Sequence, residues 1–282
     1  MPGTQRAWSI TDQEFKHFQD MLLRMTGISL ASTKRALICS RLAKRLQHWQ
    51  LHSYSEYLAL LKSGSHPGEL QLAIDLLTTN ETYFFREPRH FDFVRTQVLP
   101  QYRNGRVLRT WSAACSSGQE AYSLAMLFAD VLGLETGNWE ILASDISLRM
   151  LQRAKTGHYH LDRTHHIPAS YLSRFCLKGV QSQAGTFLVK PALRARVRLR
   201  QINLNEPLPG IGEFDLIFLR NVLIYFSAET KQQVVSRLLG ALRPGGHLIV
   251  GHSESLNGVV DGLESVMPSI YRKPLARARQ SS

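Results

Sequence analysis

The chain has 282 residues, 44% of them hydrophobic, which is enough for one large domain or two modest ones with a real core. Its formal net charge of +12 favours an acidic partner but does not distinguish nucleic acid, anionic lipid and protein. No apolar run approaches the roughly 18 residues that span a bilayer, and no secretory signal begins the sequence. Three widely separated cysteines exclude a disulfide framework. We therefore expect a reduced, cytoplasmic protein without membrane insertion.

Residues 1–77 predict an all-α domain. Thr11, followed three residues later by Glu14, is typical of the capping box that begins a helix. Residues 34–49 predict an amphipathic helix, because apolar side chains recur there at helical spacing. No acid lies in this helix, and its basic stripe consists of Lys34, Arg41, Lys44 and Arg45. Most such stripes are solvated surface, but the absence of interleaved acids favours a role in facing an acidic acceptor.

After a linker at residues 78–105, strands and helices alternate. This pattern predicts an α/β domain over residues 106–282, with a doubly wound, mostly parallel sheet and one or two antiparallel edge strands near the C-terminus. A break in the alternation at about 171–192 predicts a small antiparallel β insertion. The expected strands are 107–112, 140–143, 196–202, 214–219 and 248–251, and the expected helices are 118–132, 148–156 and 229–242.

Polar residues follow four of these strands, at the end where parallel sheets bind ligands. The turn at 113–119 is rich in small residues and opens a helix, so a ligand can approach its backbone. It has neither the Gly-x-Gly-x-x-Gly pattern nor a P-loop lysine. Glu120 lies in the first helical turn, and Asp145 ends the second strand, where such folds hold ribose hydroxyls. The third and fourth strands are followed by Asn203-Leu204 and Arg220-Asn221.

Two segments place polar groups inside aromatic and aliphatic runs. They are Asn80-Glu81-Thr82-Tyr83-Phe84-Phe85-Arg86 and Arg220-Asn221-Val222-Leu223-Ile224-Tyr225-Phe226. A buried amide or guanidinium without a partner costs free energy, so a bound polar ligand gives a reason for the pattern. Histidines 158, 160, 165 and 166 lack acids or cysteines at ligand spacing, and no metal site is predicted.

These segments resemble the chemotaxis receptor methyltransferases of the CheR type, which use S-adenosylmethionine to esterify glutamate side chains on chemoreceptors. The resemblance covers nearly the whole chain, in the right order. The matching pieces are residues 78–86, 111–123, 143–147, 214–226, 242–246 and 251–255. The chain departs from the family's usual residues at Cys115, Gln119 and Ala121, and none of these departures removes Glu120.

The resemblance implies S-adenosylmethionine as cofactor and S-adenosylhomocysteine as product. It implies that the cofactor is bound by Asn80, Thr82, Arg86, Glu120, Asp145, Asn203, Leu204, Arg220 and Asn221. Glu120 and Asp145 would hold its amino-acid and ribose parts, and which holds which is left open. Arg86 and Tyr225 would lie near the transferred methyl as the catalytic pair, although an aromatic such as Tyr225 is as often packed under a sheet end.

The implied partners are the cytoplasmic domains of chemoreceptors. Their methylation helices would supply the glutamates, and a C-terminal tail peptide would bind at Lys178–Val189; we expect a monomer. A nucleic-acid methyltransferase is disfavoured, because Arg220-Asn221-Val222-Leu223 stands where an Asn/Asp-Pro-Pro-aromatic motif is usual. A non-catalytic S-adenosylmethionine-binding signalling module is disfavoured by the intact cofactor set.

Overall fold

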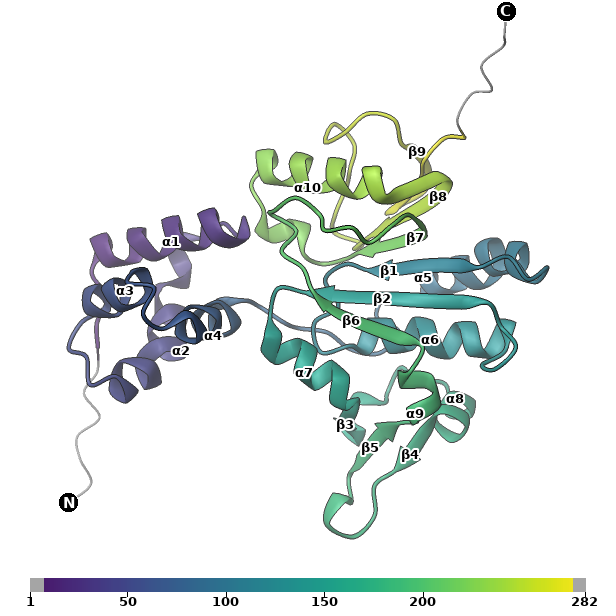
Figure 1. Ribbon diagram of the computed structural model, residues 1–282, viewed down its shortest axis with the longest axis horizontal. Helices are drawn as coiled ribbons and strands as arrows, with labels where there is room; N and C mark the ends of the chain where they lie inside the picture. The colour runs from purple at the N-terminus through teal and green to yellow at the C-terminus, as the bar shows by residue number, and fades with distance from the viewer. Residues whose placement is uncertain (1–7, 276–282) are drawn as a thin grey trace, which may run out of the picture. The chain divides into compact units, whose positions relative to one another are not determined.

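The computed structural model describes residues 8–275, and residues 1–7 and 276–282 of the predicted domains lie outside this range. The chain forms two compact units (Figure 1). The helical unit ends at Thr79 and also takes in Tyr225–Ser227, whereas the α/β unit comprises Asn80–Ile224 and the chain from Ala228 onward. Within residues 8–275, no helix combines the length and the apolar character needed to cross a membrane.

Four helices build the helical unit. They are α1 (Asp12–Thr26), α2 (Arg35–His48), α3 (Tyr54–Lys62) and α4 (Pro67–Leu77). The predicted capping box at the start of α1 is confirmed: Thr11 Oγ1 accepts from Glu14 N at 3.2 Å, and the Glu14 carboxylate accepts from Thr11 N at 2.9 Å. The apolar faces meet in one core that includes Phe18, Leu42 and Tyr54, all fully buried.

The predicted basic helix forms α2, but half of its cationic stripe is used inside the helical unit. The Arg41 guanidinium donates to the carbonyls of Leu76 and Thr78, at 3.0 and 2.7 Å, and so caps the end of α4. Arg45 forms a bidentate ion pair with Glu69, at 2.8 and 2.5 Å. The expectation that all four cations face an acceptor is therefore wrong for these two arginines.

The α/β unit is a seven-stranded sheet in the order β6-β2-β1-β7-β8-β10-β9. Its strands are β1 (Leu108–Ser112), β2 (Trp139–Asp145), β6 (Val197–Gln201), β7 (Phe214–Leu219), β8 (Leu242–Val250), β9 (Glu264–Met267) and β10 (Ile270–Arg272). Strands β6, β2, β1, β7 and β8 pair in parallel, and β10 joins β8 antiparallel. All six residues of β7 are buried, as expected of a central parallel strand. The doubly wound prediction is confirmed.

Short connections and helices link these strands. The helices are α5 (Pro88–Phe93), α6 (Gln119–Leu132), α7 (Leu148–Thr156), α8 (Ala169–Phe175), α9 (Pro191–Arg194) and α10 (Ala228–Ala241). Because β1 pairs with β2 on one side and β7 on the other, the strand order reverses beside β1. Such a reversal opens a crevice at the carboxyl ends of the strands, where ligands bind in this fold class.

A second, antiparallel sheet has the order β3-β5-β4, with β3 (His158–His160), β4 (Cys176–Lys178) and β5 (Thr186–Val189). Figure 1 shows it beside α8 and α9, next to the main sheet. The predicted insertion began too late, because β3 precedes it and residues 171–175 belong to α8. A strand of three residues is too short to show alternation in the sequence.

Candidate active site

The turn after β1 is held by the acid that ends β2. Asp145 Oδ2 accepts from Ser116 N at 2.8 Å, and Asp145 Oδ1 accepts from Ser147 N at 2.9 Å. Ser116 and Gly118 both have positive φ, of 48° and 94°. A Cβ at Gly118 would lie 2.8 Å from Ala154 Cβ, so the turn needs glycine there. The backbone of this turn is thus held in place by Asp145, the carboxylate that we predicted to bind the ligand.

The segment Asn80–Arg86 passes along the same turn. Ser116 Oγ donates to the Asn80 carbonyl at 3.0 Å, and Phe85 N donates to Ser123 Oγ at 2.9 Å. Phe84 and Phe85 are buried, whereas the neighbouring polar side chains Thr82 and Arg86 are half-buried. The aromatic residues therefore anchor the segment in the core and hold its polar residues beside the strand ends.

Arg220 is the buried centre of the site. It follows β7, and its side chain is only 1% exposed. Its Nη1 donates to Glu120 Oε2 at 2.9 Å, and its Nη2 donates to Glu87 Oε2 at 3.0 Å and to the Arg86 carbonyl. One guanidinium thus ties the ends of β1 and β7 to the linker segment.

The two carboxylates around Arg220 differ in their proton affinity. Burial raises the pKa of Glu120 above its usual range, although Arg220 and a 2.7 Å hydrogen bond from Ser112 Oγ act in the opposite direction. Burial also opposes ionisation of Glu87, but there Arg220 and the hydrogen bond from Asn221 prevail and lower the pKa. Glu120 is therefore the carboxylate that gains most from an added positive charge.

Arg86 lies at the edge of this network. Its Nη1 donates to the Glu81 carbonyl at 3.0 Å, and its guanidinium lies over the Tyr83 ring, 5.6 Å from the centroid. The Tyr83 ring also lies beside the ring of His166, with centroids 5.0 Å apart. Arg220 holds the Arg86 backbone through the Arg86 carbonyl. The contacts with Glu81 and Tyr83 orient the half-buried side chain of Arg86.

The other predicted residues lie at neighbouring strand ends, with one exception. Asn221, at φ 58°, donates from Nδ2 to Glu87 Oε1 at 3.2 Å. Asn203, after β6, donates to Glu206 Oε1 at 2.9 Å, and Leu204 beside it is buried. Tyr225 belongs instead to the helical unit, where its carbonyl accepts from Ser29 N at 2.7 Å. Arg86 and Tyr225, predicted as a catalytic pair, are therefore in different units.

Sequence reasoning missed two acids that organise the site. Glu87 pairs with Arg220, and Glu254 Oε2 accepts from the backbone N–H groups of Asn221 and Gly251, at 2.8 and 2.6 Å. Glu87 directly follows the segment that ends at Arg86, and Glu254 lies inside Gly251-His252-Ser253-Glu254-Ser255. A buried arginine at Arg220 was itself a signal that carboxylates must lie near it.

Two family models match adjoining parts of the chain. The model described as the CheR methyltransferase all-alpha domain matches residues 13–78, and the one described as the CheR methyltransferase SAM binding domain matches residues 80–271. Chemotaxis protein methyltransferase 2 of Pseudomonas aeruginosa is 41% identical over 93% of each chain. The chemotaxis protein methyltransferase of Escherichia coli is 37% identical, over 88% of this chain and 86% of its own. The solved glycopeptide N-methyltransferase MtfA is 16% identical over 69% of this chain and 60% of its own, with a TM-score of 0.36.

The chain belongs to the CheR methyltransferase family. It is an S-adenosylmethionine-dependent methyltransferase, and the residues present fit that cofactor. S-adenosylmethionine carries a sulfonium, an ammonium and ribose hydroxyls, and the strand ends of this CheR-family enzyme offer carboxylates to match. The raised pKa of Glu120 in particular marks a carboxylate that a bound cation would favour.

Proposed function

We propose that this CheR-family enzyme methylates glutamate side chains of chemoreceptors, giving glutamyl methyl esters for sensory adaptation. The match of both family domains along one chain is the observation that carries the proposal, and the Glu120–Arg220 ion pair and Asp145 lie near the strand ends of that chain. Relatives named as chemotaxis protein methyltransferases, similar over most of their length, support the substrate class.

In this proposal each strand end has a separate task. Asp145 receives the ribose hydroxyls, since it ends β2 in a doubly wound sheet. Glu120 receives the cationic amino-acid part, because its buried carboxylate gains from positive charge. Arg220 keeps Glu120 in place through the ion pair at 2.9 Å. The remaining cofactor contacts are assigned to Asn80, Thr82, Arg86, Asn203, Leu204 and Asn221.

The acceptor needs little acid–base help. A glutamate with a pKa near ~4.3 is already an anion at neutral pH, and the cofactor supplies an electrophilic methyl group. The protein must then position the carboxylate and remove its water. Arg86 is suited to this, because its guanidinium is held by Tyr83 and the Glu81 carbonyl and can grip a carboxylate through two N–H groups.

An assay with a receptor cytoplasmic fragment from the same genome tests the substrate class. The enzyme, radiolabelled S-adenosylmethionine and the fragment should give labelled receptor, and peptide mass spectrometry should locate the label on glutamates. A matched fragment in which those glutamates are replaced by alanine should stay unlabelled. Transfer to nucleic acid with no transfer to any receptor fragment would instead support the alternative that the charge of +12 first raised.

Two exposed lysines, Lys34 at the N-cap of α2 and Lys44 within α2, are proposed to contact the acidic receptor. Lys34 and Lys44 are exposed, unlike the arginines of the same stripe. Exposed cations raise the encounter rate with an acidic partner, and salt screens the effect. The Lys34→Glu, Lys44→Glu variant should methylate receptors more slowly at low salt and approach the wild type at high salt. If the variant and the wild type methylate receptors at equal rates at low ionic strength, these lysines do not contact the receptor and are ordinary solvated surface residues.

The small sheet is proposed to bind a receptor tail by strand addition. Strands β3 and β4 flank β5, so each is an edge of this sheet. An edge strand offers backbone N–H and C=O groups to an extended peptide. Leu177 and Val180, at 47% and 70% exposed, provide apolar surface at β4 and just beyond it. Fluorescence titration with tail peptides tests this, and the absence of binding to every receptor tail of the same cell would defeat it.

A further inference from the structure

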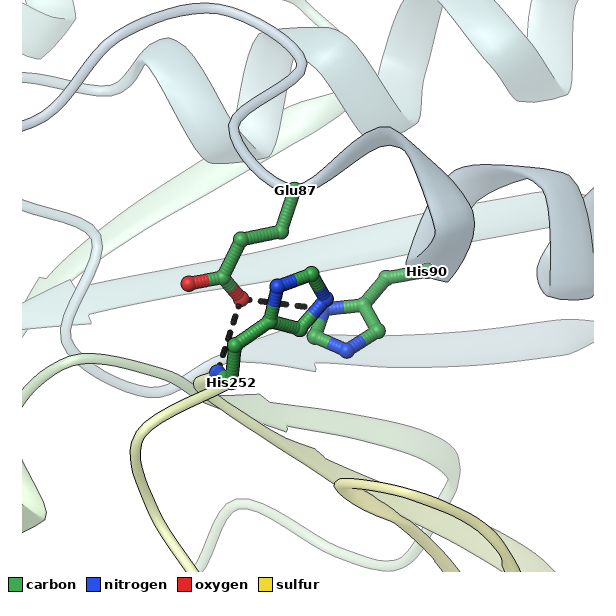
Figure 2. A group of neighbouring side chains, drawn as sticks. All are labelled: Glu87, His90 and His252. Atoms are coloured by element: carbon green, nitrogen blue, oxygen red, sulfur yellow. Dashed lines mark hydrogen bonds and ion pairs between the residues drawn. The ribbon is translucent and has the colours of Figure 1, made fainter.

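Three potential metal ligands from distant parts of the chain meet beside Arg220. Glu87 precedes α5, His90 lies on α5, and His252 follows β8. Figure 2 shows the three side chains converging, and their nearest ligand atoms all lie within 4.8 Å of one another. Because 165 positions separate Glu87 from His252, no sequence spacing reveals this group.

His90 has a ring nitrogen whose lone pair lacks a partner. The residue is 1% exposed, and its Nδ1 has no hydrogen-bond partner. Its other nitrogen, Nε2, lies 2.8 Å from Ser269 Oγ, which in turn donates to the Pro268 carbonyl at 2.6 Å. In the tautomer that matches this hydroxyl direction, Nε2 carries the hydrogen of neutral His90. Nδ1 then directs a lone pair at Glu87 Oε2, 3.4 Å away.

Glu87 Oε2 already accepts from Arg220 Nη2 at 3.0 Å and from His252 N at 3.2 Å, and a metal cation placed between this oxygen and His90 Nδ1 would also give the buried Nδ1 lone pair a partner. The distance suits such a cation: ligands about 2.0–2.1 Å from a tetrahedral Zn²⁺ stand roughly 3.4 Å apart. A metal-bound histidine commonly donates its second ring N–H to an oxygen that orients it, and Ser269 Oγ lies 2.8 Å from His90 Nε2 in the place for such an oxygen. His252 is exposed, with its ring 4.8 Å from that of His90, so it can turn its free nitrogen toward the same point.

The surrounding charge sets the strength of such a site. Arg220 lies 3.0 Å from Glu87 Oε2 and opposes a second cation there. Its single charge is shared, however, because it also pairs with Glu120 at 2.9 Å. Glu87 keeps a second oxygen, Oε1, which accepts from Asn221 Nδ2 at 3.2 Å. Glu87 and Glu120, the two acids around Arg220, carry two carboxylates against its one guanidinium.

We propose that Glu87, His90 and His252 form a binding site for one divalent transition metal of the Zn²⁺ type. Two imidazoles and one carboxylate are a ligand set that zinc accepts, with a fourth position left for water. A metal there would tie the start of α5 to the loop after β8. It would also fix Glu87, and through it the buried Arg220 of the methyltransferase site.

Metal titration of the full chain tests this proposal. The protein is freed of metal with a chelator and titrated with Co²⁺, whose tetrahedral complexes absorb strongly in the visible, and with Zn²⁺ by calorimetry. His252→Ala removes one ligand at an exposed position and should leave the fold intact. His165→Ala, an exposed histidine outside the group, is the matched control, and His90→Gln tests the buried ligand.

The wild type should bind one Zn²⁺ per chain and give a tetrahedral Co²⁺ spectrum. Loss of a direct ligand should weaken binding by at least about 100-fold in His252→Ala, more than changes to orienting groups do. Zn²⁺ should also raise the melting temperature of the wild type and of His165→Ala, but not that of His252→Ala. Equal affinity in His252→Ala and the wild type, or only weak binding that His165→Ala also reduces, would show adventitious binding to surface histidines and overturn the site.

Discussion

Replacing Arg45 with alanine should destabilise the helical unit, even though Arg45 belongs to the basic stripe that suggested receptor contact. The side chain is 19% exposed and its partner Glu69 is 4% exposed. Glu69 also accepts from Tyr57 Oη at 2.6 Å, so its carboxylate is held from two sides. Removing one partner of a buried pair costs about 3–5 kcal/mol, and the partial exposure of Arg45 places the loss near 3 kcal/mol. The free energy of unfolding of a whole domain is only about 5–15 kcal/mol, so this loss would be a large part of it.

The free energy of unfolding lost in Arg45→Ala should depend on pH, because the Arg45–Glu69 ion pair sets the pKa of Glu69. In the wild type, burial opposes ionisation of Glu69, but the bonds from Arg45 and Tyr57 prevail and lower its pKa. The carboxylate therefore stabilises the fold above its unfolded pKa of about 4.3, and this contribution disappears as pH falls through the lower folded pKa. In Arg45→Ala, the largest of the contributions that oppose burial is lost, so the pKa of Glu69 should rise. The difference between variant and wild type should thus be largest at neutral pH and shrink in acid.

Hydrogen exchange of the α2 and α4 amides in the full chain measures this locally. Lys44→Ala, an exposed cation on the same helix, is the matched control and should change the opening free energy by less than about 0.5 kcal/mol. A double-mutant cycle with Glu69→Gln should give a coupling energy between the two residues of about 0.5–3 kcal/mol, the usual range for residues in contact. If Arg45→Ala changes the opening free energy as little as Lys44→Ala does, the Arg45–Glu69 ion pair does not stabilise the helical unit. Contact of Arg45 with an acidic acceptor would then be the better explanation of this residue.

Three further predictions concern the active site. Asp145→Ala should weaken S-adenosylmethionine binding by about 1.5–3 kcal/mol, the range for charged hydrogen bonds, and unchanged calorimetric affinity in a folded variant would sink the ribose assignment. In the wild type, affinity should fall as pH is lowered through the raised pKa of Glu120, since a bound cation favours the carboxylate. Glu120→Gln should bind more weakly at neutral pH and lose this dependence, while the exposed control Glu135→Gln keeps it. Arg86→Ala should cut turnover far more than S-adenosylhomocysteine affinity, and normal turnover or an unfolded circular dichroism spectrum would contradict its proposed role.

The fold was largely predictable because its signals are periodic and local. The buried run at 214–219 has the same bounds as β7, and the helix at 148–156 the same as α7. The start of β8 was misplaced because Pro244-Gly245-Gly246, a sequence that normally ends a helix, lies inside this strand. The β3 strand was missed because three residues between Gly157 and a 3₁₀ turn show no alternation.

The site was predictable where it follows strand ends and not where it depends on pairing. The places of Asp145 at the end of β2 and of Glu120 in the helix after β1 could be predicted, and their contacts with the cofactor stay predictions. The partners of Arg45 and Arg220 could not, because Glu69, Glu87 and Glu120 reach them from 24 to 133 positions away, a matter of tertiary packing. For the same reason a helical stripe that looks uniform in sequence divides into two structural arginines and two exposed lysines.

The central claim is methyl transfer to a carboxylate, and the stability of the product bond tests it most directly. Receptor fragment labelled with radioactive methyl groups by the enzyme should be exposed to mild alkali, and the volatile label collected. A glutamyl methyl ester should release nearly all of its label as methanol, and Arg86→Ala should produce little labelled receptor. A label that survives alkali, as on a nitrogen, or the absence of any label on receptors, would contradict the account.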